Sequence, residues 1–251
     1  MKIAILLSGQ PRFTGDFDCF LRNLKGYDHA DWFCYMTNNN DVAKEIKRGE
    51  ISLGVQIPDS WRKFTVDWAI GKLQSNLPDN NHVRSFEISD SDSIKQFPES
   101  IAKSSYKSWY NIYKANQLRL DYQSRMGIEY DMILRVRPDV SLRGLLDLRC
   151  LDLELLAHSV ILPSNSWGRH QQNDTLKMCD QFAIASSDIM NVYANLYHDL
   201  QICIDLLREH SVECHPETLL LKQLRRNCIY TVEGHFQIGL RLFPCNSKKW
   251  A

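Results

Sequence analysis

The stretch Tyr130–Val140, which reads YDMILRVRPDV, joins an apolar run to a cluster of charges. The apolar residues suit a strand buried within a sheet. Arg135, Arg137 and Asp139 stand at the end of that run, around Pro138. Buried charges need partners, so a strand that ends in this way is favourable when its charges face a cleft. In open α/β sheets this cleft lies beyond the carboxyl ends of the strands. The stretch therefore predicts a binding site for a charged, phosphate-bearing ligand.

Composition limits the classes of protein to which the chain can belong. Its 251 residues, 44% of them hydrophobic, are enough for one substantial core. The formal net charge is zero, which argues against a general binder of nucleic acid or of membrane surfaces. The first apolar run, Ile3–Leu7, is shorter than a signal-peptide core, and no stretch approaches the length of a membrane span. We therefore predict a cytoplasmic protein without a transmembrane segment.

The eight cysteines show neither CxxC spacing nor the His/Cys spacing of a structural zinc site. Several of them lie within apolar patterns, such as Cys34 and Cys203. This placement favours free buried thiols in a reducing compartment. The even number of cysteines leaves disulfides as the alternative.

The N-terminal segment predicts a strand, a tight turn and a helix. Ile3–Leu7 suits a strand that is buried on both faces, and Phe17–Leu24 has helical spacing. This order presents backbone N–H groups to an anion. The segment lacks both GxGxxG and the P-loop pattern. We expect four residues of the turn to contact a nucleotide, with an ordinary tight turn as the alternative: Ser8, Gly9, Gln10 and Arg12.

Further strands and helices are predicted along the chain. Short apolar runs predict strands at 31–37, 83–88, 132–136, 160–162, 180–186, 229–232 and 236–243. Helical spacing predicts helices at 104–126, at 187–200 and from Pro216 onward. We expect residues 41–80 to be helical in places, 141–156 to be irregular and 164–178 to form a polar loop.

The helix predicted at 104–126 carries an aromatic stripe. Tyr106, Trp109, Tyr110 and Tyr113 recur at helical spacing. Such a stripe can stack on a base or a sugar, but burial preferences favour packing in the core. We expect core packing.

Three segments, in this order, resemble small GT-A-fold glycosyltransferases of the capsule and lipopolysaccharide type, including the WavE-like group. They are SGQPR after the first strand, YDMILRVRPDV after the long helix, and DQFAIAS followed by a helix and HPETLL. The resemblance implies a GT-A-like (Rossmann-like) α/β fold, in which helices flank a mixed, mostly parallel central sheet. It further implies a single domain over residues 1–251, with a nucleotide-binding half at 1–140 and an acceptor-binding half at 141–251.

At the strand end, members of the family usually carry Asp-x-Asp, which binds a divalent metal and the donor diphosphate. The matching residues are Arg137, Pro138 and Asp139. Two alternatives follow. Asp139 alone ligates Mn²⁺ or Mg²⁺ together with phosphate oxygens. Otherwise Arg137 and Arg135 neutralise the diphosphate directly, since guanidinium groups bind phosphate in a bidentate manner.

If the enzyme inverts the anomeric configuration, glycosyl transfer also needs a base that deprotonates the acceptor hydroxyl. Asp180, before an apolar strand, and Glu217, in the HPE segment, are the candidates. A turn or helix cap is the alternative role of Asp180, and a first-turn carboxylate that interacts with the helix dipole is that of Glu217. Four further residues are weaker candidates: His170, Asp174, His215 and His235.

These residues predict an enzyme that moves a sugar from a nucleotide-sugar donor to a glycan or glycolipid acceptor in polysaccharide biosynthesis. A nucleotidyltransferase that makes nucleotide sugars is one alternative. That class normally has a glycine-rich, lysine-bearing loop after the first strand, whereas SGQPRF has one glycine and no lysine. A non-catalytic nucleotide- or glycan-binding module is the other alternative.

Overall fold

The computed structural model describes residues 1–9, 15–38, 71, 73–75, 77–90, 103–163, 179–210, 212 and 214–240. The strands are β1 (Ile3–Gly9), β2 (Leu24–Lys25), β3 (Asp31–Asn38), β4 (His82–Asp90), β5 (Met132–Val136), β6 (Val140–Arg143), β7 (Leu146–Asp147), β8 (Ser159–Pro163), β9 (Phe182–Ala185), β10 (Tyr230–Gly234) and β11 (Gln237–Leu240). The helices are α1 (Gly15–Asn23), α4 (Lys103–Met126), α5 (Leu153–Leu156), α6 (Ser187–Ala194), α7 (Leu196–Glu209) and α8 (Pro216–Arg226), with a 3-10 turn, η3, at Leu148–Cys150.

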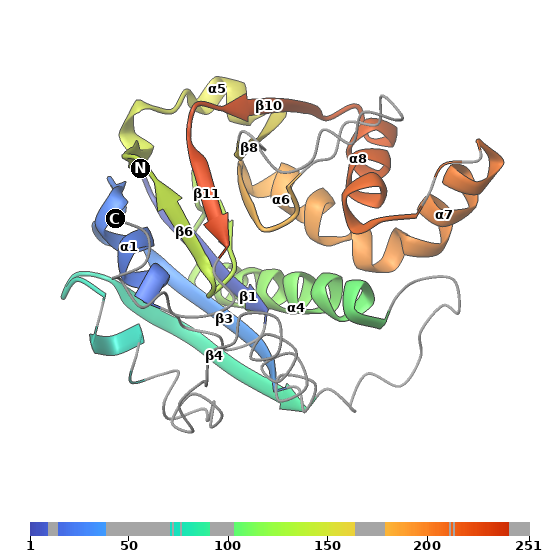
Figure 1. Cartoon of the computed structure of the whole chain (residues 1–251). Coiled ribbons are helices and arrows are strands. Elements are labelled where there is room, and N and C mark those ends of the chain that lie inside the picture. Colours follow the sequence, from blue (N-terminus) through green and yellow to red (C-terminus); the bar gives the residue numbers. More distant parts are fainter. Residues whose placement is uncertain are drawn as a thin grey trace, which may run out of the picture.

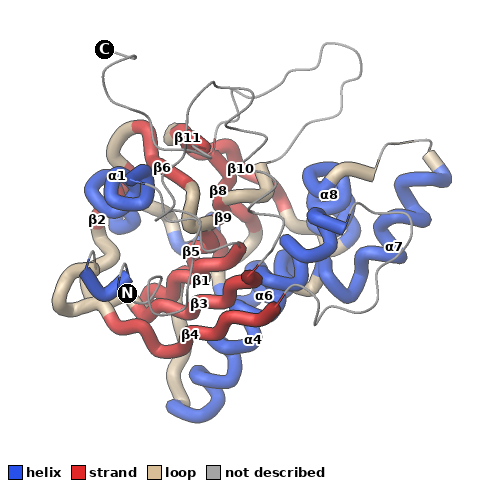
Figure 2. Tube along the Cα trace, turned by 60° about the horizontal axis from the view of Figure 1, so that its bottom comes forward, coloured by secondary structure: helices blue, strands red, loops and turns tan. Residues whose placement is uncertain are grey.

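Within the described part of the chain, one large mixed sheet has the strand order β10-β8-β9-β5-β1-β3-β4. All neighbouring pairs are parallel except the two that β9 makes with β5 and β8. The chain therefore has a mixed α/β fold with a large, mostly parallel central sheet, as predicted. Figure 2 shows this sheet between α1 on one side and α4 and α6 on the other.

Side chains on the central strands alternate between two hydrophobic layers. In β5, Met132, Leu134 and Val136 join the layer that contains α1, which we call the α1 face. Ile133 lies between them in sequence and joins the opposite layer, the α4 face, which contains α4, α6, α7 and α8. Because successive strand residues point to opposite sides of a sheet, this alternation places Arg135 on the α4 face.

The sheet reverses its order at β1. From β1 the chain crosses through α1 to β3 and continues outward to β4, and α4 then returns it to β5 on the other side of β1. The two crossovers run in opposite directions, so right-handed connections put α1 and α4 on opposite faces. In open α/β sheets, the crevice at such a switch point, beyond the carboxyl ends of the strands, is where ligands bind. Here it lies between β1 and β5.

Two short strand pairs lie outside the main sheet. β11 pairs antiparallel with β6, from Gln237 opposite Arg143 to Leu240 opposite Val140, and Figure 1 shows the two strands side by side. β2 pairs with β7. The prediction that 141–156 is irregular was therefore wrong, since this stretch also holds η3 and α5. Four residues such as Val140–Arg143 carry too short a pattern to reveal a partner strand far away in the chain.

The single helix predicted at 187–200 is two helices. α6 ends at Ala194 and α7 begins at Leu196, with Asn195 between them as the cap of both. Asn is a poor residue for a helix interior because its side chain competes for backbone hydrogen bonds. The apolar spacing continues across the junction, and this explains why the break is not evident from the sequence.

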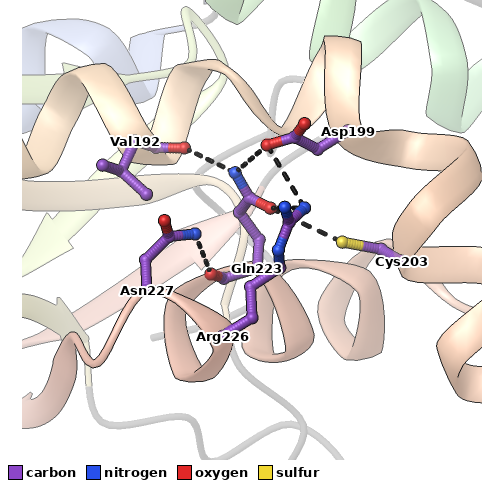
Figure 3. A network of polar contacts seen from close by, with 6 residues as sticks. All are labelled: Val192, Asp199, Cys203, Gln223, Arg226 and Asn227. Atoms are coloured by element: carbon purple, nitrogen blue, oxygen red, sulfur yellow. Dashed lines mark hydrogen bonds and ion pairs between the residues drawn. The ribbon is translucent and has the colours of Figure 1, made fainter.

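A buried glutamine ties α8 to α6 and α7 of this layer (Figure 3). Gln223 Nε2 donates to the backbone carbonyl of Val192 at 3.2 Å and to Asp199 Oδ2 at 2.8 Å. Its Oε1 accepts from the Cys203 thiol, 3.5 Å away. Arg226 adds an ion pair to Asp199 at 3.4 Å. These contacts fix the helical layer that covers the α4 face.

Several other predictions from the sequence can be compared with the structure. All seven described cysteines are free thiols, and Cys34, Cys179 and Cys203 are buried; Cys245 lies outside the described residues. Trp109 is fully buried, as expected for core packing. The structure describes no helix that is both long enough and apolar enough to cross a membrane. The predicted loop at 164–178 and most of 41–80 lie outside the described residues.

Candidate functional site

The candidate site lies at the carboxyl edge of the central sheet, at the switch point between β1 and β5. Because β9 is antiparallel to β5, its first residue, Phe182, pairs with the last residue of β5, Val136. The Arg137 backbone N–H donates to the Gln181 carbonyl at 3.2 Å. Strand ends thus bring together six of the predicted site residues: Ser8, Gly9, Arg135, Arg137, Asp139 and Asp180.

Arg137 and Asp139 form a bidentate ion pair around Pro138. Arg137 Nε donates to Asp139 Oδ1 at 2.9 Å, and Nη2 donates to Oδ2 at 2.6 Å. The Asp139 side chain is 2% exposed, whereas that of Arg137 is 24% exposed. Burial lowers the pKa of Arg137, but the charge of Asp139 and the hydrogen bonds to it outweigh burial and raise this pKa. The two hydrogen bonds of the pair fix the loop between β5 and β6.

Gly9 ends β1 beside this loop in a backbone conformation that favours glycine. Its φ is +141°, in the region that residues with a Cβ rarely adopt. A Cβ built there would lie 3.6 Å from Pro138 Cδ and 3.7 Å from Arg137 Cγ, which is ordinary contact. The need for glycine at this position therefore arises from the backbone conformation rather than from a clash.

Arg135 is completely buried on the α4 face. Its Nε donates to Ser8 Oγ at 3.3 Å, and its Nη1 donates to the backbone carbonyl of Asp180. The remaining nitrogen, Nη2, is buried without a partner among the described residues. Burial lowers the pKa of Arg135, although the nearby charge of Asp180 opposes this effect. Ser8, which was predicted to contact the nucleotide, and Arg135, which was predicted to bind phosphate, are therefore joined by a hydrogen bond.

Asp180 and Asp139 differ in the hydrogen-bond partners of their carboxylates. The residue is 8% exposed, and its backbone carbonyl accepts from Arg135 and from the Tyr193 hydroxyl, the latter at 3.3 Å. Within the described residues, no hydrogen bond or ion pair to its carboxylate is found. A general base must have an oxygen that is free to receive a proton. Asp180 therefore fits that role better than Asp139, both of whose oxygens bind Arg137.

Two aromatic residues that were not predicted to belong to the site extend it from Arg135 toward α4: Tyr193 neighbours Arg135, and Trp109 packs on Tyr193. Tyr193, on α6, shares the Asp180 carbonyl with Arg135. The ring of Trp109, on α4, packs 5.6 Å from that of Tyr193, and its indole Nε1 is buried without a partner among the described residues. Both residues follow helical spacing in the sequence, which indicates burial but does not indicate which strand they will contact.

The other predicted site residues are placed elsewhere or are not described. Glu217 lies in the first turn of α8, within the helical layer, and His215 caps that helix together with Thr218. His235 follows β10, which is three strands from β5 in the sheet order. At the usual strand spacing that is about 14 Å across the sheet. Gln10, Arg12, His170 and Asp174 lie outside the described residues.

The described residues at this edge do not form a ready metal site. Both oxygens of Asp139 bind Arg137, so neither is available to a cation in this arrangement. Across the part of the chain that the structure describes, no three His, Cys, Asp or Glu side chains gather in a way that could hold a metal ion. Ligation of Mn²⁺ or Mg²⁺ by Asp139 stays a prediction. The same bonds engage Arg137, whereas Arg135 Nη2 has no partner among the described residues, so the geometry fits neutralisation of the diphosphate by Arg135 better.

Comparison with known proteins adds no family to this description. The family models that were compared with the chain do not match it. The curated proteins do not match it either.

Proposed function

We propose that the chain is a glycosyltransferase with a GT-A-like fold that transfers a sugar from a nucleotide-sugar donor to a glycan or glycolipid. The observation that carries the proposal is the meeting of Ser8, Gly9, Arg135, Arg137 and Asp180 at the switch point of the sheet. This is the place where α/β sheets bind nucleotides. The mixed sheet and the resemblance of three sequence segments to this class of enzyme support the same proposal.

Each residue then has a specific role. The turn at Ser8 and Gly9 contacts the nucleotide. Arg135 stabilises the negative charge that develops on the diphosphate leaving group, as a fixed cation does in phosphate chemistry, and Arg137 adds positive charge at the same edge. The Asp180 carboxylate accepts the proton of the acceptor hydroxyl as the new glycosidic bond forms. No step is assigned to a metal, because both oxygens of Asp139 are engaged by Arg137.

A second candidate is a non-catalytic nucleotide- or glycan-binding module. One observation favours it: Arg137 and Asp139 satisfy each other, as in a structural ion pair that closes a loop. Such a module binds ligand without turnover.

The test has two stages. First, a thermal-shift screen with UDP-, GDP-, CMP- and dTDP-sugars, with and without Mn²⁺, should reveal a donor, because a ligand that binds only the folded state stabilises it. Second, the donor that binds should be hydrolysed slowly without an acceptor. Asp180→Asn should lower transfer by about 10²- to 10⁴-fold and leave donor affinity unchanged.

The outcomes separate the candidates. Binding with neither hydrolysis nor transfer supports the module. No response to any nucleotide sugar contradicts the glycosyltransferase and a nucleotide-binding module, and leaves only a module that binds glycans. Wild-type turnover by Asp180→Asn removes this residue as the base, and Glu217→Gln is then the variant to compare.

A further inference from the structure

Buried polar atoms without partners are concentrated beside the candidate site. In the part of the chain that the structure describes, four buried side-chain nitrogen or oxygen atoms have no hydrogen-bond partner, and two of these are Arg135 Nη2 and Trp109 Nε1. Both residues are completely buried. Both residues neighbour Tyr193, whose ring packs against that of Trp109 and whose hydroxyl shares the Asp180 carbonyl with Arg135.

Comparable side chains elsewhere in the protein are satisfied. Arg119 is also completely buried, but its nitrogens donate to four side chains: those of Asn116, Gln123, Ser187 and Asn191. Trp32 is equally buried, and its Nε1 donates to Asn81 Oδ1 at 2.9 Å. The fold therefore supplies acceptors to buried Arg and Trp donors in general. The two donors around Tyr193 are an exception that needs an explanation.

The two donors require the same kind of partner. A guanidinium N–H and an indole N–H can only donate, so whatever satisfies them must accept hydrogen bonds. The described partners of the Arg135 guanidinium are neutral, namely the Ser8 hydroxyl and the Asp180 carbonyl. The countercharge next in sequence, Asp139, is bound to Arg137. A negatively charged acceptor at Arg135 Nη2 would be more favourable than a neutral one, since hydrogen bonds between charged groups are the strong ones.

The donors also lie close to the predicted ligand crevice. Ser8 and Arg135 are the last residues of β1 and β5 that alternation places on the α4 face. Gly9 follows Ser8 at the end of β1. The buried Val136 stands between Arg135 and Arg137, which is 24% exposed. A ligand group that reaches inward past Gly9 and Val136 therefore meets Ser8 and Arg135.

We propose that Arg135 Nη2 and Trp109 Nε1 bind a phosphate oxyanion, so that Arg135 is the cation that receives the ligand while Arg137 is held by Asp139 to shape the loop. The assignment rests on the proposed function in one respect, that the phosphate is the diphosphate of a nucleotide donor. The same chemistry would also accept inorganic pyrophosphate or phosphate. The experiment therefore compares these sources.

The test is isothermal titration of the full chain with pyrophosphate, with phosphate, and with UDP and GDP, at matched ionic strength. Trp109→Phe keeps most of the aromatic ring but removes the donor, and Arg135→Lys keeps the charge but removes Nη2. Each should weaken binding of the diphosphates about 10-fold or more, the usual effect of losing one hydrogen bond to a charged group. Circular dichroism and thermal midpoints verify that the variants fold.

The chain supplies matched controls. Trp32→Phe and Arg119→Lys change equally buried side chains whose donors already have partners, so they should lower stability without changing diphosphate affinity. If Trp109→Phe and Arg135→Lys bind diphosphates as tightly as the wild type, the proposal is wrong and water is the occupant. Failure of the wild type to bind any of the four probes at millimolar concentration also overturns it.

The result is separable from that of the proposed function. Diphosphate binding that depends on Trp109 and Arg135, in a protein that neither hydrolyses nor transfers any nucleotide sugar, supports the site and contradicts the enzyme. Sugar transfer that is insensitive to Trp109→Phe and Arg135→Lys supports the enzyme and contradicts the site.

Discussion

The Arg137–Asp139 pair makes a quantitative prediction about stability, because its two partners differ in exposure. Arg137→Met leaves a carboxylate that is 2% exposed without its cation, whereas Asp139→Asn leaves a guanidinium that is 24% exposed and that water can reach. Removing one partner of a buried ion pair costs about 3–5 kcal/mol. We expect Arg137→Met to approach that range. For Asp139→Asn we expect a cost of about 1–3 kcal/mol, since partial exposure of Arg137 screens its charge.

The coupling energy between Arg137 and Asp139 is a more specific test than the effect of either single variant. Two charge-assisted hydrogen bonds join them, at 2.9 and 2.6 Å. After discounting for the exposure of Arg137, we expect a coupling energy of about 2 kcal/mol. The double variant should therefore be more stable than the sum of the single effects predicts. For a chain of this size, that difference corresponds to about 4–8 °C in Tm.

Urea unfolding, followed by far-UV circular dichroism, measures all four members of the cycle. The related pair Arg149–Asp147 is a suitable control, because it has the same bidentate geometry but Arg149 is 66% exposed. Its coupling should be much smaller, as is usual for exposed ion pairs. Additive effects of Arg137→Met and Asp139→Asn, or equal coupling in the two pairs, would refute the reasoning from burial.

Two further predictions concern the buried thiol of Cys179 and the backbone of Gly9. Burial raises the pKa of Cys179 from 9.0 to about 11, so its contribution to stability is complete below pH 9 and is lost as the pH rises toward 11. In Cys179→Ala, the free energy of unfolding should fall less steeply between these pH values, by up to about 1.4 kcal/mol per pH unit. Urea unfolding at several pH values measures this slope. A substitution of the exposed Cys150 should leave it unchanged. Gly9→Ala should destabilise the fold by about 1–3 kcal/mol because of its φ of +141°. In thermal unfolding, the exposed Gly71→Ala should show no such loss, and equal effects would argue against backbone strain.

The central strand and its charges were predictable because their signal is local. An apolar run that ends abruptly in Arg137 and Asp139 indicates both burial and an edge, and β5 occupies the predicted residues. The alternatives for Asp139 could not be decided from the sequence. Ligation of a metal and pairing with Arg137 require the same residues, and only the side-chain geometry distinguishes them.

The surroundings of Arg135 were not predictable, since they depend on contacts between distant parts of the chain. Trp109 was correctly expected in the core, but its position beside Tyr193 follows from the packing of α4 against α6. Helical spacing indicates which face of a helix is buried, but it does not indicate which element packs against that face. The same limit explains why the pairing of β6 with β11 was missed.

The pairing of β6 with β11 has a consequence for synthesis of the protein on the ribosome. β6 begins at Val140, directly after the loop that carries Arg137 and Asp139, but its partner strand ends only at Leu240. At the usual rates of translation, about 5–20 s separate the emergence of the two strands. During that interval the nascent chain carries the charged loop without the strand that anchors its far side. The order of translation therefore delays formation of the β6–β11 pair, next to the charged loop, until the whole described chain has been made.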